Sequence, residues 1–141
     1  MREGTPLTPF GAHLRQLRAA RSMTAAAMAR AVGVTPTYLA ALERGRRGRP
    51  SWALVQRIIG HLGVIWDEAA EIERLAMLSH PRIMIDTSEL APEATLLANR
   101  LSRRIGELTP EALARMQAIL DEDDAGAVVS AARRAARPAS R

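Results

Sequence analysis

Apolar residues recur at helical spacing along most of the chain, and capping and turn residues divide this pattern into short segments. The pattern predicts seven helices, at about residues 9–21, 25–33, 36–44, 52–63, 66–78, 93–105 and 110–120. Between the fifth and sixth lies a connection at residues 79–92, whose centre, IMID, could be extended. The sequence therefore predicts an all-α protein.

The second and third of these segments have the pattern of two helices that cross at a tight turn. Gly33 lies at the bend, where glycine readily adopts a positive φ angle. Thr35 is placed to cap the next helix, and Pro36 to occupy its first turn. The side chains expected to face a shared core are Met28, Val32, Val34, Leu39 and Leu42, with the small Ala29 at the crossing. This helix-turn-helix pattern is typical of proteins that read DNA.

Residues 10–64 resemble the Xre-type helix-turn-helix regulators, which are similar to phage repressors and Cro. The motifs that carry the resemblance are FGAHLRQLRAARSMT at 10–24, MARAVGVTPTYLAALERGRRGRPS at 28–51 and LVQRIIGHLGV at 54–64. It implies a five-helix domain whose third helix enters the major groove of double-stranded DNA. Where the family usually has a DNA-contacting glutamine, this chain has Ala25, so one polar contact is missing.

The resemblance places most of the DNA-binding residues in the third helix or directly beside it. Those nearest the base edges would be Thr35, Pro36, Thr37 and Ala41, a set without arginine, asparagine or glutamine. Arg44 could reach a base or a phosphate. The remaining expected contacts, to the DNA backbone, come from Thr24, Tyr38, Arg46, Arg47 and Arg49. The alternative for the two threonines is that they only cap and solvate the helix.

One ion pair is also implied by the resemblance. Arg18 and Glu43 match family positions that join the first helix to the end of the third. Glu43 is the sole acidic residue between Glu3 and Asp67, which suits a specific partner. We expect this pair to hold the DNA-reading helix in place.

Charge divides the chain into three parts. Residues 1–65 carry a net charge of +8, residues 66–124 one of −7 and residues 125–141 one of +4, within a total of +5. A basic first part suits a phosphate-rich partner. We therefore expect a DNA-binding domain at 1–65, an acidic helical region at 66–124 and a disordered Ala/Arg-rich tail at 125–141.

The last two expected helices form an amphipathic hairpin that cannot bury its apolar faces alone. It would pack on the first domain or on a second copy of the chain. We favour a homodimer, since two half-sites add base contacts and phosphate neutralisation. The residues expected at the dimer interface are Leu97, Leu101, Ile105, Leu113, Met116 and Leu120.

Enzymatic chemistry fits the sequence poorly. The chain has no cysteine, and its three histidines, His13, His61 and His80, are far apart in sequence. We expect no metal, no cofactor, no catalytic residue, no membrane segment and no N-terminal signal.

These patterns together predict a bacterial transcriptional regulator, a homodimeric repressor in the cytoplasm on the nucleoid, with a prophage-like gene cluster as a possible target. One alternative is an antitoxin-like autorepressor whose acidic C-terminal half binds a protein partner. Another is an interaction module that no longer reads DNA.

Overall fold

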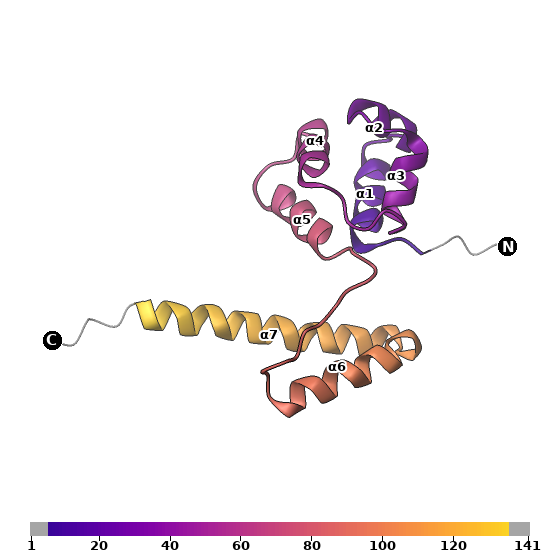
Figure 1. Cartoon of the computed structure of the whole chain (residues 1–141). Coiled ribbons are helices and arrows are strands. Elements are labelled where there is room, and N and C mark those ends of the chain that lie inside the picture. Colours follow the sequence, from indigo (N-terminus) through magenta and orange to yellow (C-terminus); the bar gives the residue numbers. More distant parts are fainter. Residues whose placement is uncertain (1–5, 136–141) are drawn as a thin grey trace. The chain divides into compact units, whose positions relative to one another are not determined.

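The computed structural model describes residues 6–135, and within that range every regular element is a helix (Figure 1). This confirms the predicted all-α fold. The helices are α1 (Pro9–Ala20), α2 (Ala25–Ala31), α3 (Pro36–Glu43), α4 (Trp52–Leu62), α5 (Trp66–Met77), α6 (Pro92–Arg104), a 3₁₀ turn η1 (Ile105–Glu107) and α7 (Pro110–Ala135). The chain divides into two compact units, one ending at Met84 and the other beginning at Ile85.

Each of the first four helices begins with a hydroxyl cap. The side chains of Thr8, Thr24, Thr35 and Ser51 accept a hydrogen bond from the backbone N–H three residues later, at 3.0 to 3.3 Å. Such a cap satisfies an N–H group that has no partner within the helix. At the bend between α2 and α3, Gly33 has the positive φ angle that the sequence predicted, +78°.

Helices α1 to α5 gather around one core in the first unit (Figure 1). The predicted apolar positions of the helix pair are buried or, for Val34, partly buried, and Ala29 is fully buried. The largest fully buried apolar side chains are Phe10, Leu14, Met28, Val32, Leu39, Leu42, Val55, Ile58 and Ile72. The core therefore contains one aromatic side chain and is otherwise aliphatic.

The first unit extends beyond the boundary predicted at residue 65. Helix α5 packs on α1 and α4 and buries Ile72 and Ala76 in the shared core. After α5, the Ser79 hydroxyl donates to the carbonyl of Leu75 and accepts the N–H of Phe10 at 2.9 Å. The change of charge at residue 66 misplaced the boundary because α5 carries several acidic residues and still completes the core with its apolar face.

The second unit contains α6, η1 and α7, and the connection at residues 79–91 forms neither helix nor strand. Helix α7 continues to Ala135, so its predicted end near Leu120 is wrong, and residues 125–135 of the predicted disordered tail are helical. Alanine, glutamate and arginine favour helix, and the next proline along the chain is Pro138. Residues 136–141 of the predicted tail lie outside the described residues.

Large apolar side chains of the second unit are exposed. Among the residues predicted to dimerise, Leu97 is 63% exposed, Ile105 53% and Leu120 60%. Leu113 and Met116 are less exposed, and Leu101 is half-buried. The unit by itself therefore leaves apolar surface that a packing partner would cover.

Candidate nucleic-acid interface

Helix α3 has one face buried in the core and one face that is accessible. Leu39 and Leu42 point into the core and are fully buried. Thr37, Ala41 and Arg44 follow one another at intervals of three or four residues, which places them along one side of the helix. Thr37 is exposed, while Ala41 and Arg44 are half-buried.

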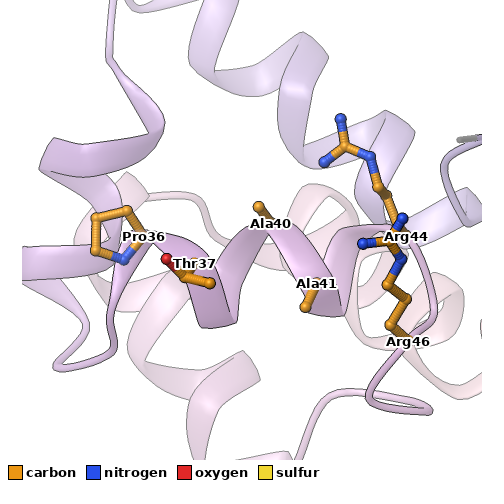
Figure 2. Close-up of a pocket in the computed structure, with 6 residues that line it drawn as sticks. All are labelled: Pro36, Thr37, Ala40, Ala41, Arg44 and Arg46. Carbon is orange, nitrogen blue, oxygen red and sulfur yellow. The ribbon is translucent and has the colours of Figure 1, made fainter. Parts of the chain in front are cut away.

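This accessible side borders an open hollow of about 610 Å³. Figure 2 shows its lining along α3, with proline and threonine at one end and two arginines at the other. The lining residues are Pro36, Thr37, Ala40, Ala41, Arg44 and Arg46. Methyl groups and one hydroxyl thus lie beside cationic donors, a combination that can meet the edge of a base and a neighbouring phosphate.

Half of the predicted DNA-binding residues meet in this hollow, which contains Pro36, Thr37, Ala41, Arg44 and Arg46. Ala40 also lines the hollow but was not among the predicted site residues. Its position three residues after Thr37 is the signal that could have identified it.

The other predicted residues lie outside the hollow, and several have structural tasks. The hydroxyl of Thr35 accepts the N–H of Tyr38 at 3.0 Å, and that of Thr24 accepts the N–H of Ala27 at 3.0 Å. Both are therefore helix caps, as the alternative for Thr35 supposed. A capping hydroxyl still has its own proton, which it can donate to a phosphate.

The basic loop, residues 45–50, is folded tightly onto the end of α3. The N–H of Gly45 donates to the carbonyl of Leu42 at 3.0 Å, and that of Arg46 to the carbonyl of Ala41 at 2.9 Å. This is the Schellman arrangement, in which Gly45 adopts a positive φ angle of +75°. The arrangement holds the loop arginines at the end of the helix.

Within this loop, Arg46, Arg47 and Arg49 are all exposed. The guanidinium of Arg47 lies 5.7 Å from the centre of the Tyr38 ring, a cation–π distance. Tyr38 in turn packs against the core. The ring therefore positions a cation beside α3.

The predicted ion pair between Arg18 and Glu43 is confirmed. Both guanidinium nitrogens Nη1 and Nη2 face the carboxylate, and the two side chains are only 7% and 3% exposed. The carbonyl of Glu43 also accepts the N–H and the hydroxyl of Thr8, at 2.9 and 3.0 Å. The last residue of α3 is thus fastened to the N-cap and to the last turn of α1.

The carboxyl groups with lowered pKa values lie outside this surface. Hydrogen bonds from Arg74 lower the pKa of Glu71 on α5, and those from the hydroxyl and N–H of Ser88 lower the pKa of Asp86. Among residues 6–135, no group of three histidine, cysteine, aspartate or glutamate side chains could hold a metal ion. No helix in the same range is long and apolar enough to cross a membrane.

Comparison with known proteins finds a domain family to which the first unit is similar. Residues 9–75 match the family model of a helix-turn-helix domain, a range that includes most of α5. RghRB of Bacillus subtilis (strain 168), an uncharacterized HTH-type transcriptional regulator, is 33% identical over 61 residues, which are 43% of this chain and 44% of the relative. The match thus spans less than half the length of that relative, and no solved structure matches significantly. The helix-turn-helix domain predicted from the sequence is confirmed.

Proposed function

Because residues 9–75 form a helix-turn-helix domain, we propose that the protein is a sequence-specific, DNA-binding transcriptional regulator of the Xre type. The observation that carries the proposal is the accessible side of α3. Small apolar side chains line the hollow on this side together with Arg44 and Arg46, and a buried ion pair holds the helix in place. A regulator named as HTH-type among the relatives supports the same class.

In this proposal α3 lies in the major groove, which is wide enough to admit an α-helix. Thr37 and the alanines of the hollow face the base edges, and Arg44 reaches a base or a phosphate. The loop arginines bind the phosphates on one side of the groove. Thr24 binds a further phosphate through its hydroxyl and the N–H groups at the start of α2.

We further propose that the protein acts as a homodimeric repressor through its second unit. The exposed apolar side chains of α6 and α7 favour pairing with a second copy, and two copies would read two half-sites. A small dimer over a promoter blocks polymerase sterically and needs no further domain. A bacterial cytoplasm with its nucleoid is the corresponding location, and a prophage-like gene cluster is a possible target.

A second candidate function is an antitoxin-like autorepressor. The exposed acidic residues of the second unit favour it, notably Glu93, Glu107, Glu111 and the run DEDD at 121–124. Together with the apolar side chains they would suit a basic protein partner. A partner of this kind that co-purifies with the chain, encoded by a neighbouring gene, would favour this function.

The proposal is tested by removing the loop arginines together. In the variant R46A/R47A/R49A, binding to a labelled duplex of mixed sequence should fall steeply, and the dependence of log K on log salt should flatten by about 0.9 per lost phosphate contact. The matched control is R100A/R103A/R104A, which removes the same charge from α6 and should bind nearly as the wild type does. Unchanged binding by the loop variant at moderate salt would contradict the proposal.

A further inference from the structure

A segment expected from the sequence to be a simple connection lies against the basic loop. Pro81 packs on Gly45, where a β carbon on the glycine would stand 3.2 Å from the proline Cγ. His80 packs on Gly48, where a β carbon would stand 3.3 Å from the imidazole Nε2. The turn that bears His80 is anchored by the buried Ser79, which bonds to Leu75 and Phe10. The structure thus brings residue 80 to residue 48 within one compact unit.

A hydrogen bond sets the orientation and the tautomer of the His80 ring. The ring nitrogen Nδ1 accepts the backbone N–H of Arg82 at 3.1 Å. A nitrogen that accepts a hydrogen bond carries no proton, so the N–H of the ring is on Nε2. Nε2 is also the ring atom beside Gly48. Residue 80 is exposed, and the nitrogen that carries the donor lies at the loop.

The neighbours of this donor indicate its ligand. Gly48 lies between Arg47 and Arg49, both exposed and both assigned to DNA phosphates in the proposed function. Arg82, two residues beyond the histidine, is exposed as well. A single N–H donor among several cations suits an anionic oxygen, and neutral side chains commonly contact DNA phosphates in this way. Residue 80 is not part of the hollow along α3, so a base contact is not indicated.

We infer that His80 is a phosphate-binding residue of the interface, donating its Nε2–H to a backbone phosphate beside those bound by Arg47 and Arg49. The inference rests on the proposed function, since it requires DNA at the loop. It adds a contact from the end of the first unit, thirty residues after the end of the loop in sequence. It also gives the segment at residues 79–82 a function, to carry a donor to the loop.

Two substitutions in the full chain separate the two ring nitrogens. In H80N the amide carbonyl can accept the N–H of Arg82 in place of Nδ1, as asparagine does in an Asx turn, but nothing replaces Nε2. In H80Q the longer side chain can bring its amide N–H to the former position of Nε2. Affinity for a fluorescein-labelled duplex of mixed sequence should fall about threefold to tenfold in H80N, and H80Q should recover most of the loss.

Two further variants serve as controls. H61N makes the same change at an exposed histidine near the far end of α4 and should bind as the wild type does. H80F keeps a ring on Gly48 without a donor, so it should lose as much affinity as H80N. Thermal unfolding of each variant identifies any loss of fold, and H80F keeps the test valid if H80N proves unstable.

The outcomes distinguish the two proposals. Equal binding by the wild type, H80N and H80F overturns the role of His80 and leaves the proposed function intact. Failure of H80Q to recover affinity overturns the assignment of the contact to Nε2. If the wild-type protein does not bind the duplex, the proposed function fails and this inference fails with it.

Discussion

Gly11 of α1 lies directly against the backbone of Glu43 at the end of α3. A β carbon on Gly11 would stand 2.8 Å from the α carbon of Glu43 and closer still to its carbonyl oxygen, whereas real β carbons essentially never approach within 3.0 Å. The two helices therefore cross backbone to backbone, at the same residue whose carboxylate binds Arg18. The position of α3 therefore depends on a glycine without a side chain as well as on an ion pair.

Replacing Gly11 with alanine should force α1 and α3 apart. The added methyl group meets backbone atoms, which cannot rotate away as a flexible side chain could. We expect the free energy of unfolding to fall by about 3 kcal/mol, as for an overpacked core. Urea denaturation followed by circular dichroism measures the change.

The control for this prediction is the same substitution at Gly60. This glycine is exposed on α4, and a β carbon there would meet nothing within 4 Å. Since alanine favours helix over glycine, G60A should raise the free energy of unfolding by about 0.5–1 kcal/mol. If G11A were as stable as the wild type, the close crossing would be refuted.

Replacing Glu43 with alanine should leave Arg18 buried without its counterion. Removing one partner of a buried pair costs about 3 kcal/mol, mostly because the remaining charge is desolvated. Chemical denaturation measures this loss. DNA affinity should fall as well, because the end of α3 loses its attachment to α1.

The exposed pair of Glu71 and Arg74 provides the comparison. Their side chains are 40% and 58% exposed, so E71A should cost less than about 1 kcal/mol. Arg74 lowers the pKa of Glu71 from its ordinary value of 4.5. The small contribution of this pair is therefore complete above that value and is lost as the pH falls through the lowered pKa. Equal losses in E43A and E71A would show that burial does not strengthen the first pair.

Local features of the sequence predicted most of the fold. Helix starts follow from hydroxyl caps, and the bend at Gly33 follows from its positive φ angle, because both depend on residues close together in the chain. The pairing of Arg18 with Glu43 came from the family resemblance. Nothing in the sequence predicted the close crossing at Gly11. The crossing depends on where two distant segments meet and not on the φ angle of the glycine.

The candidate site was likewise predicted in part. The residues of α3 that line the hollow share one side of a helix, so spacing places them together. The position of His80 beside Gly48 depends on how α5 packs and where its end is tied. The same packing explains why the first unit ends at Met84 and not at residue 65, where the charge pattern placed its end. The spacing of residues in the sequence predicts neither the position of His80 nor this boundary.

Valine at positions 35 and 37 should have opposite consequences. Thr35 caps α3, so T35V removes a hydrogen bond to the N–H of Tyr38 and should cost about 1 kcal/mol of stability. Thr37 is exposed in the hollow, so T37V should leave stability nearly unchanged. If Thr37 meets a base, T37V should change the preference at one base pair by about tenfold or more.

Selection of bound sequences from randomised duplexes, together with urea denaturation, measures both effects. If T35V were as stable as the wild type, Thr35 would not stabilise α3 as a cap. If T37V selected the same sequences as the wild type, Thr37 would not contact a base. The pair is matched, because each substitution replaces a hydroxyl with a methyl group on the same helix.

Aspartate at Leu97 and Met116 should prevent dimerisation of the full chain. Leu97 lies on α6 and Met116 on α7, and both are accessible within the second unit. If a second copy covers them, burying a charge there is unfavourable and apolar burial is lost, so the dissociation constant of the dimer should rise about 100-fold or more. Light scattering coupled to size-exclusion chromatography measures the mass.

The control for the dimer is M84D. Met84 is 94% exposed in the connection between α5 and α6, outside the predicted interface. It receives one such charge and should not change the mass. Because two half-sites bind more tightly than one, L97D/M116D should also bind a two-site duplex more weakly while M84D does not. An undiminished dimer in L97D/M116D would exclude these residues from the interface, and the apolar surface of α6 and α7 would then require another partner.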